Sequence, residues 1–374
     1  MIRTGSVVVF SLFFLTISLV LLGVIMVLSA SQFLFASSPD QNVYEFMGRQ
    51  LMWLSLGLAC LSFFAYTDFN IWERWARWIL LLNIVLLAAV LFTPLGVEIR
   101  SARRWLRFGI NLGQPSDLTK LAVIIYLAAV WAERKEELER FWQGVFFPMC
   151  LAGLALGLIL LQPDHGTVAF IGALCMVMWF AAGGKLIHML PVIGLCVAGF
   201  LAALYSHPGL FERIIAFLNP EDYRTTKYFQ VYQAMIGFAH GGMWGVGLGE
   251  GVQQLGFTPD THTDFIFSVI GEELGFVNSS IVLLAYLGLV WTGYYIAVRS
   301  TNPFGSLLAV GCTTAIGLQA AMNIAVVTGS MPTTGIPLPF ISYGGSALMI
   351  FMSMIGILIS IARETFDTGF FGEE

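Results

Sequence analysis

The stretch Pro259-Asp260-Thr261-His262-Thr263-Asp264-Phe265-Ile266-Phe267-Ser268-Val269-Ile270-Gly271-Glu272-Glu273-Leu274-Gly275 opens an apolar segment that continues to residue 297. Ionisable side chains stand at the head of this segment, and two carboxylates follow inside it. Charge is costly in hydrocarbon, so ionisable residues at or below a membrane surface are candidate functional residues. The stretch therefore predicts a membrane helix with a polar site at its start.

The composition of the whole chain also indicates a membrane protein. Hydrophobic residues make up 57% of the 374 residues and charged residues only 11%, whereas a soluble domain carries about 25% charged residues. The mean hydropathy is +0.81. The net charge of −5 and the lack of a basic tail give no indication of nucleic-acid binding. The five cysteines lie in apolar runs without disulfide or metal spacing, and we interpret them as small buried side chains.

Ten apolar runs have the length of about 20 residues that a membrane-spanning helix needs. They cover residues 8–30, 50–67, 76–95, 117–132, 145–161, 166–183, 186–205, 264–297, 304–328 and 342–362. We therefore predict an all-α polytopic membrane protein of about ten transmembrane helices. Both termini then lie on one side, and residues 1–374 form a single domain.

A long loop, residues 206–262, separates the seventh run from the eighth. Apolar residues recur at helical spacing in it, at Phe211, Ile214, Ile215 and Leu218 and again from Tyr228 to Met235. This pattern predicts amphipathic helices that lie on a membrane surface.

Basic residues do not settle which side of the membrane is which. Nine Lys and Arg residues fall on the side of the termini and eight on the other, so the positive-inside rule does not discriminate. Four of the eight lie in Arg100-Ser101-Ala102-Arg103-Arg104-Trp105-Leu106-Arg107. Arginine matches phosphate geometry bidentately, so an external anion-binding site would explain the cluster. The alternative is a reversed orientation in which these arginines set the topology.

The fourth run begins with a polar helix start. Gln114-Pro115-Ser116-Asp117 predicts a helix N-terminus with Ser116 as the N-cap. Lys120, the one lysine inside the predicted spans, follows on the same helix face as Asp117. It is a candidate for binding an anion; the alternatives are a structural ion pair with Asp117 and snorkelling to the interface.

The eighth run begins in a similar way. Thr263 is predicted to cap the helix, and Asp264 to lie in its first turn, where the helix dipole favours an anion. The alternative for Asp264 is a helix-start residue without chemistry. Glu272 and Glu273 lie deeper and point in different directions, so at least one faces the bundle interior. We interpret that pair as structural.

Two further segments add polar groups at the membrane depth of these two helix starts. Asp164 lies in the loop Gln162-Pro163-Asp164, and residues 331–346 contain too much Pro and Gly for a continuous helix. Irregular backbone at membrane depth is tolerated where it lines a cavity. Gln319 and Asn323 share a helix face just before this segment, and we interpret them as interhelical hydrogen-bonding residues.

Together these stretches resemble the SEDS family of bacterial cell-wall polymerases, which includes FtsW, RodA and SpoVE. The resemblance covers almost the whole chain, and Gly245 to Gly249 with Gln253 is more similar to the FtsW division branch than to the RodA elongation branch. The chain departs from the family pattern at Asp117, often Glu, and at His165, often apolar. The matching residues are Arg49-Gln50, Arg103-Arg104-Trp105, Gln114-Pro115-Ser116, Lys120, Gln162-Pro163-Asp164, His262-Thr263-Asp264-Phe265-Ile266-Phe267, Gly271-Glu272-Glu273-Leu274-Gly275, Pro337-Leu338-Pro339 and Ser342-Tyr343-Gly344-Gly345-Ser346.

The resemblance implies a peptidoglycan glycosyltransferase with a SEDS-type bundle in the bacterial inner membrane. Both termini would be cytoplasmic and the long loop external. The enzyme would polymerise lipid II into glycan at the outer face, for septal rather than lateral wall synthesis. Its implied partners are a class B penicillin-binding protein transpeptidase and other membrane proteins of the divisome or elongasome.

The resemblance also assigns expected roles to individual residues. Asp264 is the expected general base of an inverting transfer. No ligand set demands a cofactor, although a divalent cation, Mg²⁺ or Mn²⁺, would be compatible with the chemistry. The alternatives are a lipid II flippase, an ion-coupled transporter and a scaffold for division proteins. The residues expected to bind substrate are Lys120, Arg103, Arg104, Arg49, Asp117, Asp164, Arg213, Gln233, His262 and Ser342.

Overall fold

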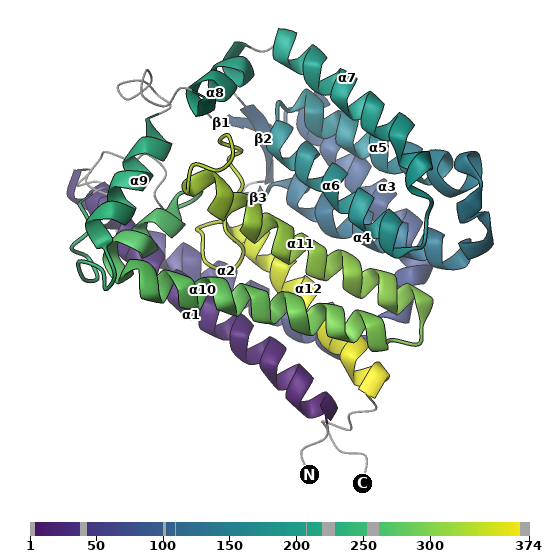
Figure 1. The fold of residues 1–374 in the computed structure, drawn as a ribbon, viewed down its shortest axis with the longest axis horizontal. Helices are drawn as coiled ribbons and strands as arrows, with labels where there is room; N and C mark the ends of the chain where they lie inside the picture. Colours follow the sequence, from purple (N-terminus) through teal and green to yellow (C-terminus); the bar gives the residue numbers. More distant parts are fainter. Residues whose placement is uncertain are drawn as a thin grey trace.

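The fold was obtained as a computed structural model (Figure 1), which describes residues 4–37, 43–99, 102–108, 110–206, 208–218, 229–252 and 262–366. Most of the described chain is helical. Its α-helices are α1 (Thr4–Ser37), α2 (Val43–Tyr66), α3 (Asn70–Phe92), α4 (Pro115–Glu133), α5 (Phe147–Leu161), α6 (His165–Ala181), α7 (Leu190–Ser206), α8 (Pro208–Leu218), α9 (Gln230–Gly241), α10 (Ile266–Arg299), α11 (Pro303–Val327) and α12 (Gly345–Phe366).

Shorter elements complete the chain between these helices. The 3₁₀ helix η1 (Lys135–Glu139) and the π-helix η2 (Phe141–Phe146) connect α4 to α5, and the 3₁₀ helix η3 (Leu186–Met189) precedes α7. Strands β1 (Gly96–Ile99), β2 (Ala102–Phe108) and β3 (Ile110–Gly113) lie between α3 and α4 and form an antiparallel sheet in that order.

The helices match the ten predicted spans. Seven segments in the described ranges are long and apolar enough to cross a membrane: α1, α3, α4, η2 with α5, α10, α11 and α12. The apolar helices α6 and α7 are shorter, and α2, which contains Arg49, is the tenth. The prediction of a polytopic helical membrane protein is confirmed.

Helix α4 lies at the centre of the bundle. It contacts α3, α5, α6, α11 and α12, and its residues from Leu121 to Trp131 are all buried. Its sequence is apolar around the whole circumference, a pattern typical of a helix surrounded by other helices. Because α4 is central, its polar residues Asp117 and Lys120 lie inside the protein rather than against lipid.

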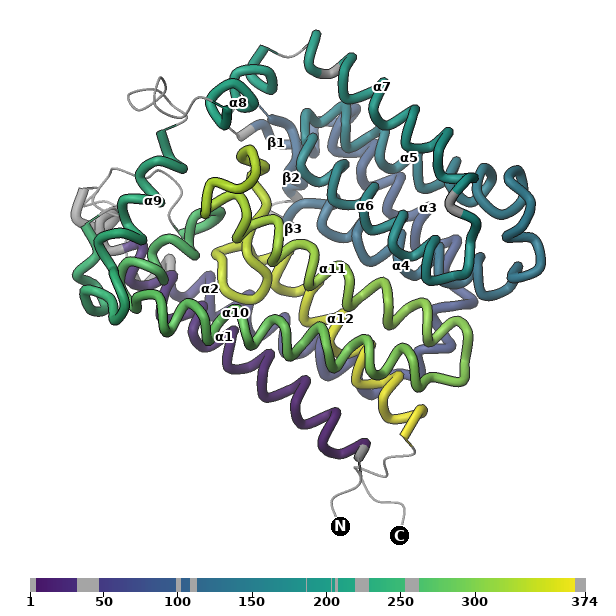
Figure 2. The backbone as a smooth tube through the Cα atoms, viewed as in Figure 1, coloured from purple at the N-terminus to yellow at the C-terminus, as the bar shows by residue number. Residues whose placement is uncertain are grey.

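A small residue lets α12 pack closely against α2. A Cβ atom added at Gly356 would lie 2.4 Å from the carbonyl oxygen of Leu61, so a larger residue would push the helices apart. Close approach through small residues is a common way for membrane helices to associate. The start of α1 and the end of α12 lie near one end of the bundle, whereas the sheet, α8 and α9 lie toward the other (Figure 2).

Helix α10 is interrupted at Gly275, where the sequence predicts one continuous helix over 264–297. Gly275 has φ 78° and ψ −179°, a conformation open essentially only to glycine. Loop residues 242–252 pack against the interruption: the Phe276 N–H donates to the Gly242 carbonyl at 2.9 Å, and the Gly247 N–H donates to the Glu273 carbonyl at 3.0 Å. The loop therefore supplies hydrogen bonds where the helix lacks them.

Two buried carboxylates precede the interruption. Glu272 and Glu273 are each 1% exposed, so both face the interior. The Ser29 hydroxyl lies 2.6 and 2.8 Å from the two Glu273 carboxylate oxygens. Glu272 Oε1 accepts the Val252 N–H at 2.9 Å and lies 3.0 Å from His240 Nδ1. These contacts tie α1, α9 and the 242–252 loop to α10, in agreement with a structural interpretation of the pair.

The sheet was not predicted. Its central strand carries Arg103, Arg104 and Arg107 of the predicted basic cluster, while Arg100 and Ser101 lie outside the described residues. In the long loop, α8 and α9 occupy the segments with helical apolar spacing, although residues 219–228 also lie outside the described ranges. The position of these helices on a membrane surface stays a prediction.

Candidate functional site

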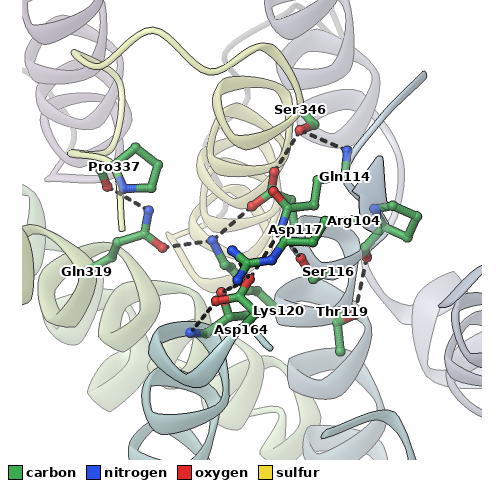
Figure 3. Close-up of polar contacts among 12 residues, drawn as sticks. Arg104, Gln114, Ser116, Asp117, Thr119, Lys120, Asp164, Gln319, Pro337 and Ser346 are labelled. Atoms are coloured by element: carbon green, nitrogen blue, oxygen red, sulfur yellow. Dashed lines mark hydrogen bonds and ion pairs between the residues drawn. The ribbon is translucent and has the colours of Figure 1, made fainter. Parts of the chain in front are cut away.

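Lys120 is held inside the bundle by groups on two helices. Its Nζ atom lies 3.0 Å from Asp117 Oδ1 on the same helix and 2.9 Å from Gln319 Oε1 on α11 (Figure 3). Lys120 is 3% exposed and Asp117 9%. A buried charge is stable only when it is paired and hydrogen-bonded. The ion pair with Asp117, one of the alternatives that the sequence left open for Lys120, is present.

The second oxygen of Asp117 contacts the start of α12. Ser346 Oγ donates to Asp117 Oδ2 at 2.7 Å and accepts the Gln114 N–H at 3.3 Å. The N-cap of α4 is Gln114, without a side-chain cap bond, so the prediction that Ser116 caps this helix is wrong. The helix starts earlier because Pro115 is well suited to its first position.

Asp164 extends this polar group toward the sheet. Its side chain caps α6 by accepting the Thr167 N–H at 3.2 Å, and its Oδ2 accepts from Gln114 Nε2 at 3.2 Å. Arg104 Nη1 lies 3.7 Å from the same oxygen, and Arg104 Nη2 donates to the Pro163 carbonyl at 2.6 Å. Figure 3 shows Arg104 and Asp164 beside Asp117 and Lys120. Four predicted site residues thus form one cluster.

Arg103 points away from this cluster. Its Nε donates to the Gly96 carbonyl at 3.1 Å, its Nη1 to the Leu91 carbonyl at 3.3 Å, and its Nη2 to the Thr93 carbonyl. Leu91 and Thr93 lie at the C-terminal end of α3, where a cation is favoured by the helix dipole. All three nitrogens have backbone acceptors, so Arg103 attaches the sheet to α3.

Asp264 lies in the turn just before α10. The N-cap is Phe265, again without a side-chain cap bond, so the predictions that Thr263 caps the helix and that Asp264 lies in its first turn are wrong. The Asp264 side chain is partly exposed, and its Oδ2 lies 3.6 Å from where a Cβ atom of Gly335 would be. Gly335 has φ +71°, a conformation that favours glycine, and it places residue 335 next to this carboxylate.

The remaining residues of this turn contact the segment before α12. Ser342 Oγ lies 2.6 Å from the Thr263 carbonyl and accepts the Leu338 N–H at 2.8 Å. The Tyr343 N–H donates to the His262 carbonyl at 2.9 Å, and their rings meet edge to face. Burial raises the pKa of the Tyr343 phenol, and the Arg49 guanidinium partly offsets this rise. Arg49 on α2 thus lies within electrostatic reach of this second cluster, which consists of the turn 262–264 and residues 342–343.

The segment of residues 331–344 lies between the two clusters. Gln319 Nε2 donates to the Pro337 carbonyl at 2.9 Å. Asn323 Nδ2 donates to the carbonyls of Ile336 at 2.8 Å and Asp264 at 2.7 Å. The sequence indicated these two amides only as interhelical contacts; their shared helix face was the signal that they act together.

Two predicted residues lie elsewhere. Arg213 on α8 is exposed, and its Nη1 reaches the Thr333 carbonyl at 3.5 Å. A cleft between α8, α9 and the segment after α11 is lined by Arg213 together with Val231, Met235 and Met331. Gln233 on α9 is partly exposed. The contacts of Arg213 and Gln233 do not join them to the clusters around Lys120 and Asp264 within the described residues.

This arrangement can bind an anion and accept a proton. It combines a buried lysine, two arginines and a partly exposed carboxylate. Among the described residues, no group of three or more His, Cys, Asp or Glu side chains is placed to hold a metal ion. The basic side chains offer positive charge to an anionic substrate.

Comparisons with known proteins agree on one family. A family model described as cell cycle protein, covering FtsW, RodA and SpoVE, matches residues 10–366. The chain is 39% identical over 354 residues to the probable peptidoglycan glycosyltransferase FtsW of Trichlorobacter lovleyi, covering 94% of this chain and 92% of that one. It is 35% identical over 351 residues to the stage V sporulation protein E of Bacillus subtilis, covering 93% and 95%.

Solved structures show the same relationship. One is a chain from work on the structural coordination of polymerization and crosslinking by a peptidoglycan synthase complex. It superposes with a TM-score of 0.76 at 27% identity, covering 96% of this chain and 98% of that chain. The rod shape determining protein RodA of Thermus thermophilus superposes with a TM-score of 0.67 at 26% identity, covering 94% and 96%.

Proposed function

The chain belongs to the FtsW, RodA and SpoVE family of cell cycle proteins, and we propose that it is a peptidoglycan glycosyltransferase that polymerises lipid II. Its relatives named FtsW favour septal wall synthesis over lateral synthesis. Its similarity to a chain of a peptidoglycan synthase complex supports a penicillin-binding protein as partner. We assign that partner to class B, which supplies the transpeptidase that crosslinks the new glycan.

The proposed reaction extends a glycan strand by one inverting displacement. The 4-hydroxyl of an acceptor sugar attacks C1 of the lipid-linked donor, and the C1–O bond to the polyprenyl pyrophosphate breaks. The hydroxyl proton goes to the general base, and the pyrophosphate leaves with the bonding electron pair. An α-linked donor becomes a β-linked product, so one carboxylate behind the hydroxyl is sufficient.

Asp264 is the proposed general base. Its partial exposure allows a sugar hydroxyl to approach its carboxylate. Arg49 is the proposed bidentate pyrophosphate ligand, because guanidinium groups bind phosphate oxygens in this way. Arg104 donates its Nε and Nη2 to the carbonyls of Gln162 and Pro163 and is proposed to contribute positive charge at the pyrophosphate. His262 and Ser342 shape the same turn through their contacts with Tyr343 and Thr263.

Lys120 is proposed to contribute positive charge from inside the bundle. Its burial strengthens its electrostatic interactions at short range, and Asp117 balances most of its charge at longer range. Asp117 and Gln319 fix its position. The single observation that carries the proposal is that Lys120 and Asp264 are joined to one segment. Gln319 bonds both Lys120 and the Pro337 carbonyl. Asn323 bonds the backbone carbonyls of both Asp264 and Ile336.

The proposal also fixes the orientation in the membrane. The site lies at the end of the bundle where α4, α6, α10 and α12 begin, whereas α1 begins and α12 ends at the other end. A reaction on lipid II at the outer face of the cytoplasmic membrane then requires cytoplasmic termini. We propose that the protein works at the division septum with this orientation.

A polymerisation assay tests the function directly. The purified chain and its transpeptidase partner would receive lipid II in detergent, and glycan polymer would be measured by gel electrophoresis. We expect polymer from the wild type and none from folded Asp264→Asn. The matched control is Asp68→Asn, because Asp68 is exposed in the turn before α3, at the opposite end of that helix from the sheet, and accepts hydrogen bonds from the neighbouring Asn70.

The outcomes separate the alternatives. Polymer from Asp68→Asn with none from Asp264→Asn supports the proposal, while equal polymer from both removes Asp264 from the mechanism. If the wild type makes no polymer but moves lipid II across vesicle membranes, the flippase alternative replaces the enzyme.

A further inference from the structure

Two buried amides of α11 contact both candidate clusters, and neither is a reacting group in the proposed reaction. Gln319 and Asn323 are 0% and 1% exposed. They lie four residues apart, which places them about 6 Å apart along one face of the helix. Gln319 bonds Lys120, and Asn323 bonds the backbone of Asp264. The spacing of the two amides therefore influences the distance between Lys120 and Asp264.

Gln319 uses both ends of its amide. Its oxygen accepts from Lys120 Nζ at 2.9 Å, and its nitrogen donates to the Pro337 carbonyl at 2.9 Å. A residue that only filled space between helices would need neither contact. The amide thus bridges the segment at Pro337 and the ammonium group of Lys120, so a shift of one would move the other.

Asn323 does the same for the carboxylate side. Its nitrogen donates at once to the Ile336 carbonyl at 2.8 Å and to the backbone carbonyl of Asp264 at 2.7 Å. The Asp264 side chain projects from the turn that precedes α10. The Asn323 contact attaches the backbone of this turn to α11 and to Ile336.

We propose that Gln319 and Asn323 are positioning residues, which set the distance between the buried cation and the carboxylate base by holding both to residues 336 and 337. This inference rests on the proposed function, because it gives the amides a role in that reaction. A purely structural alternative is that the amides only satisfy carbonyls of an irregular segment at membrane depth. The two differ in what the substitutions do to turnover.

Three variants separate these possibilities. Gln319→Met and Asn323→Leu keep approximate side-chain size and remove the hydrogen bonds. Asn302→Leu is the matched control, because Asn302 caps the opposite end of α11 through the N–H groups of Phe304 and Gly305 and also bonds Asn70. It removes an amide from the same helix without touching the site. Lipid II polymerisation would be measured per folded protein, with hydrogen exchange of residues 336–344 on the same samples.

A positioning role predicts a defect in turnover. A misplacement of about 1 Å can cost about 100-fold in rate, so we expect kcat of both site variants to fall by about that factor, with KM within about threefold of the wild type. Hydrogen exchange of residues 336–344 should accelerate in both. Asn302→Leu should retain wild-type kcat and exchange in this segment.

Other results would overturn the inference. If the two site variants turn over as fast as Asn302→Leu, or lose activity through KM alone, the amides do not position the reacting groups. In both cases an active wild type leaves the proposed function standing. If the wild type itself makes no polymer, the proposed function fails and the positioning role fails with it.

Discussion

Ser346 at the start of α12 donates its hydroxyl proton to Asp117 Oδ2 at 2.7 Å and so joins α12 to the first turn of α4. The other oxygen of that carboxylate lies 3.0 Å from Lys120 Nζ. Asp117 therefore balances a buried cation while a hydroxyl stabilises its own charge. Asp117 is therefore the residue that joins Lys120 to the start of α12.

Removing the Asp117 charge should destabilise the fold. Asp117→Asn leaves Lys120 buried without a counter-charge, and breaking a buried pair in this way costs about 3–5 kcal/mol. Ser346→Ala removes one hydrogen bond and should cost about 1 kcal/mol. Thermal unfolding of both purified variants in detergent measures the difference. Equal stability of the two variants would mean that Lys120 does not need the Asp117 charge in the folded protein.

The charge of Lys120 should matter for polymerisation. Lys120→Met keeps the aliphatic volume but removes the ammonium group, and loss of one preorganised charge from a site costs about 100-fold to 1,000-fold in rate. Lys185→Met is the matched control, because Lys185 is exposed and pairs with Glu139 at 3.2 Å at the far end of α4 and α6. We expect the control to polymerise lipid II at the wild-type rate. A similar rate from both variants would leave Lys120 with only a structural role.

The two neighbouring arginines should behave differently. Arg103→Ala removes one contact to a carbonyl of β1 and two contacts to carbonyls at the end of α3, so we expect lower thermal stability with near-normal turnover in the protein that folds. Arg104→Ala removes a cation beside Asp164, so we expect a higher KM for lipid II. Measuring unfolding and kinetics on both variants tests this division. A KM defect confined to Arg103→Ala would reverse the two assignments.

The sequence predicted the helices and the main charged residues because both follow from local chemistry. Apolar runs of spanning length are visible without tertiary information, and the cost of charge in hydrocarbon marks Lys120 and Asp264. Each N-cap was misplaced by two residues, because the caps are Gln114 and Phe265 and neither makes a side-chain cap bond. A cap bond depends on backbone geometry that residue type alone does not fix.

Other features were beyond prediction because they depend on contacts between distant residues. The sheet between α3 and α4 is short, and its central strand is rich in arginine rather than alternating. Gln319 and Asn323 were recognised as a pair, but their acceptors at Ile336 and Pro337 belong to an irregular segment whose path only the fold defines. The sequence therefore identifies the residues of the site but not their arrangement in space.

The interruption of α10 should depend on one glycine. A Cβ atom at Gly275 would lie 2.3 Å from the Gly245 nitrogen, and φ is +78°, so Gly275→Ala must displace the 242–252 loop or force the helix straight. The control is Gly172→Ala in α6, where a Cβ atom meets nothing within 4 Å and where alanine should stabilise the helix by about 0.5–1 kcal/mol.

Thermal unfolding should separate these two glycines by sign. We expect Gly275→Ala to lower the midpoint and Gly172→Ala to leave it unchanged or raise it. Straightening α10 would also pull Glu272 from the Val252 N–H and from His240, so hydrogen exchange at residues 246–252 should accelerate in Gly275→Ala. A Gly275→Ala protein with wild-type stability and exchange would show that the loop, and not glycine, holds the interruption open.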